Sequence, residues 1–495
     1  MSFNSWIFLI FCPVVILVYY LLPHKVRWVW LLAASYFFYM SWNVWLVFLI
    51  FSTTAVSYLA GILIEKSNST KVKKLWLILT LVVCLGLLVF FKYFNFLVGS
   101  VISVLQAFSL PISSWSLDIL LPIGISFYTF QTLSYVIDVY RGKYKAEKHV
   151  GYYALFVSFF PQLVAGPIER PGDLIPQLKA EHHFDLDDFL IGFRIFVCGF
   201  FYKVCVADFL GIFVNKAFGS LSEATSLTIA LASLLFCFQI YGDFNGYSEI
   251  ATGTARMMGI RLTRNFNRPY MSLTYTEYFR RWHITLNRWF TYYLYIPLGG
   301  NRKGKFRKII NIIIVFFLCG LWHGANWTYV LWGLNCAFWL IMEEIFGPML
   351  SSFFGKRGVD ANGKGMRIFR HAIFLIGLIP GGILFRSQSI AEVGLAFQRL
   401  FTGWTPSFFQ TTFAVLGMGV VEAIIVIALI GFMEYLITFS EINRDALTSE
   451  RFSTMGAKKL VGHFAVMAAA IACIAFLWIY AVQNGGNSAF AYFQF

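Results

Sequence analysis

Two histidines in apolar parts of the sequence could carry out proton transfer. His323 lies in the segment Trp322–Trp327, and His283 lies in the segment Arg281–His283. Imidazole is the side chain best matched to proton transfer near neutral pH, and a histidine in hydrocarbon costs free energy unless it has partners. The small residues after His323 would let another group approach closely. Both residues are therefore candidate catalytic groups, although His323 could instead donate to a helix carbonyl and His283 could bind lipid headgroups.

Charged side chains are few inside the apolar runs, which makes each a candidate for function. Asp243 lies in the segment 241–247, where glycine and asparagine predict irregular backbone near a helix end, so it could orient a catalytic histidine or cap that helix. A transporter would use such charges as a proton relay, so they leave an enzyme and a transporter both open. These residues are Asp138, Lys203, Asp208, Asp243 and Glu249.

Motifs of several common enzyme classes are absent. The sequence has no GxSxG elbow, Walker A loop, HExxH zinc pair or complete GxGxxG loop. His182 and Asp187 match the His-x4-Asp spacing of soluble acyltransferases, but the loop is polar and we treat this match as chance. We expect Asp185, Asp187 and Asp188 instead to lead into a helix that begins near Phe189, where acidic residues in the first turn suit the helix dipole. The eight cysteines show no CxxC spacing, so we expect neither a disulfide framework nor a metal site.

The composition places most of this chain in lipid. Apolar residues make up 59% of the 495 residues and charged residues only 13%. Each crossing needs roughly 20 residues as a helix, because the backbone must satisfy its own hydrogen bonds, whereas a barrel would show short alternating strands. The sequence therefore predicts an all-α polytopic integral membrane protein with about eleven transmembrane helices plus re-entrant and interfacial helices.

Several segments illustrate this organisation. The first apolar stretch, 6–22, has no basic region before it, so we expect a retained helix rather than a signal peptide. The stretch 119–140 is expected to span, whereas 152–165 is too short and is expected to be re-entrant or buried. The amphipathic stretch 274–298 is predicted to be a helix lying at the membrane interface.

The net charge of +15 resides in short loops, so anionic membrane lipids rather than nucleic acid are the expected partner. If the N-terminus is outside, every basic loop falls inside and the C-terminus falls outside. His323 then lies in a helical hairpin reached from outside, whereas His283 lies inside. A route between the two histidines is therefore expected to cross most of the bilayer.

Taken in order along the chain, several motifs resemble the membrane-bound O-acyltransferase (MBOAT) family, specifically its bacterial branch of alginate O-acetyltransferase membrane subunits. Each motif alone is weak, but together and in this order they are specific, and they cover nearly the whole chain. They are residues 121–128, 138–142, 161–170, 243–248, 265–270, 281–283, 295–300, 321–324 and 492–495.

The resemblance implies a membrane O-acyltransferase that moves an acetyl group from a cytoplasmic donor, with acetyl-CoA as the expected substrate, for O-acetylation of an extracytoplasmic polysaccharide. His323 matches the essential histidine of the family and would be the general base toward an acceptor hydroxyl, with His283 assisting or orienting. The donor's phosphates would be held by Arg280, Arg281, Arg288 and the loop Arg302–Lys308. Neither a bound cofactor, a metal nor a covalent acyl-enzyme residue is expected. The candidate substrate-binding residues are Arg281, Trp282, Asn287, Arg288, Trp322, Asn326, Asp243, Tyr247, Gln131, Glu169 and Arg170.

The same resemblance implies a single transmembrane domain over 1–495, with N-terminal helices in 1–110, a core with both histidines in 111–350, and C-terminal helices in 351–495. It implies a bacterial cytoplasmic (inner) membrane location, in which the charge alternation predicts both termini to be extracytoplasmic. The expected partners are a separate extracytoplasmic acetyltransferase of the Ser-Gly-Asn-His hydrolase type (SGNH) and other polysaccharide-secretion proteins.

Two other functions remain open from the sequence. One is a teichoic-acid D-alanyltransferase membrane subunit, which takes its acyl group from a carrier protein. The other is a transporter or polymer-export subunit without chemistry. The acceptor polysaccharide is also open, because the motifs do not define residues that recognise sugar.

Overall fold

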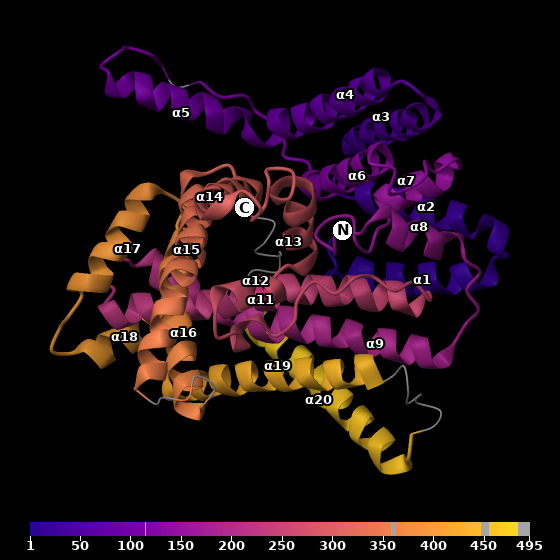
Figure 1. Cartoon of the computed structure of the whole chain (residues 1–495). Coiled ribbons are helices and arrows are strands. Elements are labelled where there is room, and N and C mark those ends of the chain that lie inside the picture. Colours follow the sequence, from indigo (N-terminus) through magenta and orange to yellow (C-terminus); the bar gives the residue numbers. More distant parts are fainter. Residues whose placement is uncertain (114, 358–359, 361–362, 447–454, 484–495) are drawn as a thin grey trace. The chain divides into compact units, whose positions relative to one another are not determined.

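The computed structural model describes residues 1–113, 115–357, 360, 363–446 and 455–483, and every regular element in these ranges is a helix (Figure 1). The all-α prediction is confirmed for this part of the chain. The motif at residues 492–495 lies outside the described residues.

The chain divides into two compact units, the first comprising Met1–Phe193 and Ala251–Thr263. Its helices are α1 (Trp6–Leu21), α2 (His24–Met40), a 3-10 turn at Val44–Leu46, α3 (Val47–Lys66), α4 (Thr70–Leu88), a π-helical turn at Val89–Tyr93, α5 (Phe94–Ala107), α6 (Ile125–Tyr140), α7 (Val150–Ser158), α8 (Pro171–Lys179) and the beginning of α9 (Leu186–Phe201). Within this unit α3 packs against α4, α6 and α7, and α7 also packs against α2 and α8.

The second unit comprises Arg194–Ile250 and Arg264–Phe495. Besides the end of α9 and most of α11 (Ser226–Met257), it contains a π-helical segment at Tyr202–Asp208, α10 (Phe209–Gly219), a 3-10 turn at Pro269–Met271, α12 (Tyr275–Arg281), α13 (Ile284–Phe290), a π-helical turn at Thr291–Tyr295, α14 (Gly304–His323), α15 (Trp327–Lys356), α16 (Lys364–Arg386), α17 (Ile390–Thr402), α18 (Phe408–Leu416), α19 (Val420–Ala446) and α20 (Ala457–Gln483). Helix α15 packs against α12, α14 and α16 (Figure 1).

Nine helices in the described part of the chain are long and apolar enough to cross a membrane, so this is a multi-pass membrane protein. The helices α1, α2 and α6 have 16, 17 and 16 residues. They fall at or below the shortest length of a full crossing, so they are not among the nine.

The segment expected to span over 119–140 becomes helical only at Ile125. Gly124 before it has φ +78°, and a Cβ at this position would lie 2.8 Å from the backbone oxygen of Leu163. A left-handed residue in such close contact ends the extended chain and lets α6 begin. The short helix α7, by contrast, is buried as expected, with nine residues.

The segment 274–298 is not one continuous helix, which corrects the prediction of a single interfacial helix. Trp282 is extended and His283 has φ +42°, so the chain leaves α12 and re-enters helix at α13. Hydrogen bonds to the preceding strand-like stretch cause the break: Asn267 N donates to Arg281 O and Ile284 N donates to Asn265 O, each at 2.8 Å. Tertiary hydrogen bonds have replaced intrahelical ones here.

Candidate active site

His323 is the last residue of α14 and is 8% exposed. The chain then reverses over three residues into α15, whose first turn is capped by Asn326, as its side chain accepts from Thr328 N at 3.1 Å. The predicted helical hairpin is therefore confirmed. The Asn326 amide also donates to Gln388 O at 2.8 Å, so this candidate substrate-binding residue supports the turn.

Glycines let the two helices of the hairpin approach closely. A Cβ at Gly320 would lie 2.3 Å from the backbone oxygen of Tyr329, and one at Gly333 would lie 2.1 Å from that of Phe316. Gly324 is also occupied from one side, because a Cβ there would lie 2.3 Å from the Tyr329 ring. The small residue after His323 thus admits a side chain of the protein itself, which fixes the end of α14.

Aromatic rings surround the His323 imidazole. The ring centroids of Trp332, Trp322 and Phe385 lie 4.9, 5.0 and 5.4 Å from it. These rings come from α15, α14 and α16, so three helices position the histidine. An imidazole in such an apolar environment interacts strongly with the few polar groups that reach it.

His283 is 1% exposed and is held by Asn265. Its Nδ1 lies 3.0 Å from Asn265 Oδ1, which also accepts from the Thr285 hydroxyl at 3.0 Å, while the Asn265 amide donates to Ser248 Oγ at 3.2 Å. This network assigns the proton to Nδ1 and leaves Nε2 as the acceptor atom of the neutral ring.

Burial lowers the pKa of His283 well below its ordinary value, and the neighbouring His323 adds a smaller effect in the same direction. The ring is therefore neutral near pH 7. A neutral ring with one hydrogen-bonded nitrogen can orient another group or accept one proton.

The two histidines meet at one side chain. The Trp322 ring lies 5.7 Å from the His283 ring and 5.0 Å from the His323 ring, measured between centroids. The expectation that most of the bilayer separates the two histidines is wrong. The charges of the loops place the two histidine segments on opposite sides of the membrane. The break at Trp282 and His283, however, turns the chain toward the end of α14.

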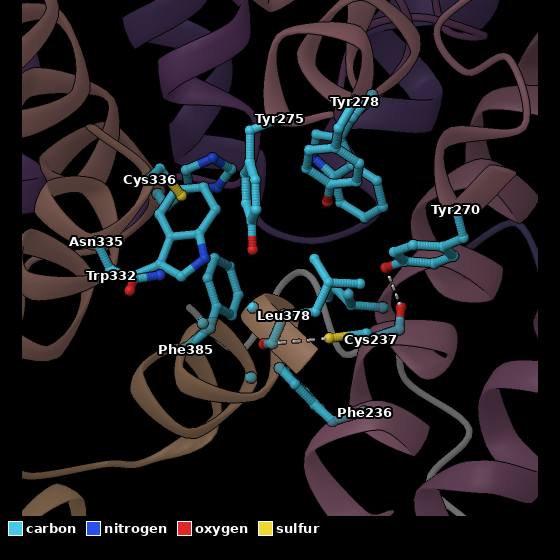
Figure 2. A pocket seen from close by; sticks show the side chains of 16 residues that line it. Phe236, Cys237, Tyr270, Tyr275, Tyr278, Trp332, Asn335, Cys336, Leu378 and Phe385 are labelled. Atoms are coloured by element: carbon cyan, nitrogen blue, oxygen red, sulfur yellow. Dashed lines mark hydrogen bonds between the residues drawn. The ribbon is translucent and has the colours of Figure 1, made fainter. Parts of the chain in front are cut away.

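A cavity adjoins His323 (Figure 2). Its walls come from α11, the stretch from Tyr270 to Trp282, α15 and α16, and they are mostly aromatic and aliphatic. Trp282, a candidate from the sequence, lines the cavity. The polar or hydrogen-bonding side chains in the wall are His323, Tyr270, Tyr275, Tyr278, Trp282, Trp332 and Asn335.

Sequence reasoning did not identify Tyr270, Tyr278, Trp332 or Asn335 as site residues. A signal was present for the last two, since Asn335 is a polar residue inside an apolar span and Trp332 lies one helical turn before it. Tyr270 and Tyr278 gave no such signal, because tyrosines are common near the membrane interface.

Some basic and amide side chains of α12 and α13 are bound within the protein, whereas others are exposed. Arg281 forms an ion pair with Glu277 at 2.7 Å, whereas Arg288 is exposed. The Asn287 amide donates to Trp282 O at 2.6 Å, which stabilises the break between the two helices. Arg280 is also exposed, so it and Arg288 remain candidates for holding an anion.

Asp243 lies in the interior of α11 rather than near a helix end, so the prediction of irregular backbone there is wrong. Its carboxylate pairs with Lys203 at 2.8 Å, and Lys203 also pairs with Asp208 at 2.7 Å. Asp243 therefore stabilises a buried cation, while Tyr247 lies buried in the same helix.

Gln131, Glu169 and Arg170 belong to the first unit and do not line the cavity. Gln131 donates to Phe156 O at 2.6 Å, and Glu169 accepts from the Thr263 hydroxyl at 2.9 Å. The first contact joins α6 to α7, and the second joins two loops of the first unit. Asp187 and Asp188 lie in the first turn of α9, which begins at Leu186 rather than near Phe189.

No three His, Cys, Asp or Glu side chains in the described ranges form a group that could hold a metal ion.

Comparisons with known proteins match this arrangement. The model of MBOAT, the membrane-bound O-acyltransferase family, matches residues 149–377, which include both histidines. The chain is 38% identical over 404 residues to a probable alginate O-acetylase AlgI of Pseudomonas putida, covering 81% of the chain and 80% of the relative. It is 36% identical to a peptidoglycan O-acetyltransferase of Helicobacter pylori, covering 67% and 68%. A teichoic acid D-alanyltransferase of Bacillus subtilis is 29% identical and covers 45% of the chain.

Proposed function

This chain belongs to the membrane-bound O-acyltransferase family, and from that premise we propose that it passes an acetyl group from a cytoplasmic donor to an acceptor for O-acetylation of an extracytoplasmic polysaccharide. It is an O-acyltransferase and a multi-pass membrane protein. The relatives named for alginate and peptidoglycan O-acetylation support acetyl as the group transferred.

The observation that carries the proposal is the position of His323 in the wall of an apolar cavity. His323 accepts the proton of an acceptor hydroxyl while the hydroxyl oxygen attacks the carbonyl carbon of the acyl donor. The bond to the donor's leaving atom then breaks, and the histidine returns the proton to it. An apolar cavity limits competing hydrolysis because it holds little water.

His283 has a supporting role in this proposal. Its Nδ1 is bound to Asn265, and its ring contacts the Trp322 ring that also contacts His323. The neutral ring thereby fixes one wall beside the base. Trp322 is the positioning residue through which His283 acts.

Acetyl-CoA is the proposed donor, used as a substrate rather than as a bound cofactor. Exposed basic residues on and after α12, namely Arg280, Arg288, Arg302 and Lys303, supply charge for its phosphates. A carrier protein would instead need a docking surface, and the D-alanyltransferase relative matches less of the chain.

The proposed location is the cytoplasmic membrane of a bacterium, with both termini outside and the basic loops inside. The proposed direct acceptor is a separate extracytoplasmic acetyltransferase of the SGNH type or another carrier, working with further polysaccharide-secretion proteins. Membership of an acyltransferase family argues against a transporter without chemistry.

The test measures acetyl groups on surface polysaccharides in a strain that lacks this protein. Wild type should restore acetylation, His323→Ala should not, and the exposed His183→Ala is the matched control that should restore it. Acetylation that is unchanged in the deletion strain, or restored by His323→Ala, would contradict the proposal.

A further inference from the structure

Three tyrosines line the cavity, and their hydroxyls differ in what they bind. The Tyr270 hydroxyl donates to Cys237 O at 2.6 Å (Figure 2). The Tyr278 hydroxyl interacts with that of Tyr270. The Tyr275 hydroxyl has no hydrogen-bond partner among the described protein residues, although the residue is only 7% exposed. Figure 2 shows its side chain extending into the cavity with the oxygen directed inward.

The ring of Tyr275 is held in place on several sides. It stacks on Trp339 at 5.4 Å with an angle of 4° between the planes, and the edge of Phe374 meets it, also at 5.4 Å. Thr274 caps the helix at this point, accepting from Glu277 N at 3.1 Å. The hydroxyl is therefore preorganised rather than free to turn toward another partner.

The opposite wall is shaped around this hydroxyl. A Cβ at Gly377 in α16 would lie 2.7 Å from Tyr275 Oη, so only glycine leaves the hydroxyl its position. Burial raises the pKa of the Tyr275 hydroxyl above its ordinary value, which keeps it protonated and able to donate.

A buried hydroxyl without a partner has lost its hydrogen bonds to water and gained none in return, which destabilises the empty site. A bound ligand that brings an oxygen atom into the cavity removes this cost. Because His323 lines the same cavity, the reacting carbonyl of the donor must enter it for the base to act on the attacking hydroxyl. Among the hydrogen-bonding side chains of the wall, Tyr275 combines a hydroxyl without a protein partner in the described residues with a ring fixed by stacking, so it is the donor best placed to receive the carbonyl oxygen.

We propose that Tyr275 Oη donates a hydrogen bond to the carbonyl oxygen of the bound acyl thioester. The inference rests on the proposed function. As the acceptor oxygen forms its bond to the carbonyl carbon, the carbonyl oxygen gains negative charge and the Tyr275 hydrogen bond strengthens. The carbon–sulfur bond then breaks, the carbonyl re-forms, and the proton held by His323 passes to the thiolate. The hydroxyl of Tyr275 keeps its own proton throughout.

The first test is Tyr275→Phe, which removes one oxygen and keeps the ring stack. The purified full chain in lipid nanodiscs should lose about 10²–10³-fold in kcat with acetyl-CoA, with a much smaller change in KM, because the hydrogen bond strengthens in the transition state. The control is Tyr153→Phe, which removes a hydroxyl that donates to Ser57 at 2.6 Å in the first unit and should retain wild-type kcat.

A pair of unreactive analogues identifies the atom that Tyr275 binds. S-acetonyl-CoA has a carbonyl near the thioester position, whereas S-propyl-CoA has the same chain without it. Tyr275→Phe should weaken binding of S-acetonyl-CoA by about threefold to tenfold, the value of one hydrogen bond, and leave S-propyl-CoA unchanged. Equal weakening of both analogues would mean that the substitution only deforms the cavity, which would overturn the inference.

His323→Ala separates this inference from the proposed function. If His323→Ala retains acetyl transfer, the proposed function fails. If His323→Ala abolishes transfer but Tyr275→Phe keeps wild-type kcat, only the inference about Tyr275 fails. Gly377→Ala is the second variant, because its methyl group should displace the Tyr275 hydroxyl and reproduce the loss of kcat, whereas Gly431→Ala, with nothing within 4 Å, should not.

Discussion

His283 Nδ1 lies 3.0 Å from Asn265 Oδ1, across 18 residues of sequence. This contact fixes the tautomer of a buried histidine whose backbone has the left-handed φ of +42°. Asn265 also holds the start of α13, because its backbone oxygen accepts from Ile284 N at 2.8 Å, while Asn267 N donates to Arg281 O at the end of α12. One asparagine therefore sets both the backbone path and the ring orientation of the second histidine.

Replacing Asn265 should impair the enzyme without removing either histidine. Asn265→Ala deprives His283 Nδ1 of its acceptor, and we expect acetyl transfer to fall by about 10- to 100-fold, because small misplacements of active-site groups carry costs of this size. The measurement is kcat with acetyl-CoA, beside Asn68→Ala, an exposed asparagine in the first unit that should be neutral. Wild-type kcat in Asn265→Ala would show that the orientation of His283 is unimportant.

The stability of the protein should depend on the protonation of His283. Its pKa in the folded state is well below the ordinary value of 6.5, so the unfolded chain binds the proton more readily. The stabilisation is complete above about pH 6.5 and is lost as pH falls from there toward the folded-state pKa, at up to about 1.4 kcal/mol per pH unit.

Thermal unfolding in detergent between pH 7.5 and pH 5 measures this effect. His283→Gln should flatten the fall in the unfolding temperature, whereas His183→Gln, at an exposed position, should leave it as in wild type. If the unfolding temperature falls by the same amount in all three proteins, titratable groups other than His283 cause the pH dependence.

Lys203 should be needed mainly for stability. Lys203→Met leaves the buried carboxylates of Asp243 and Asp208 without their cation. We therefore expect the free energy of unfolding to fall by about 3–5 kcal/mol. Adding Asp243→Asn should recover part of the loss, because it removes one uncompensated charge. Thermal unfolding is the measurement, and the exposed Lys71→Met is the matched control. If Lys203→Met alone is as stable as wild type, Lys203 does not have the stabilising role assigned to it.

The hairpin that carries His323 should tolerate no side chain at Gly333. A methyl group there would lie 2.1 Å from Phe316 O, so Gly333→Ala should separate α14 from α15 and cost about 1–3 kcal/mol. Gly347→Ala in the same helix meets nothing within 4 Å and should be neutral. Unfolding temperature and kcat are both measured for Gly333→Ala, because the separation of α14 from α15 should also displace His323.

The hairpin and the membrane character were predictable because they depend on local properties. Long apolar stretches must form helices in lipid, and the short polar turn after His323 leaves room only for a reversal. The break at Trp282 and His283 was not predictable from periodicity, because the hydrogen bonds that cause it come from Asn265 and Asn267. Asp243 was misjudged for a related reason, since its partner Lys203 is 40 residues away.

By itself the sequence determined the fold class, the two histidines and the family motifs, since these depend on residue types and their order. Only the tertiary structure decided that both histidines contact Trp322 and that Tyr275 directs its hydroxyl into the cavity beside His323. Charge alternation assigns loops to sides of a membrane, but it contains no information on how far a broken helix reaches inward. That reach is set by long-range hydrogen bonds and by glycines that let α14, α15 and α16 pack around the site.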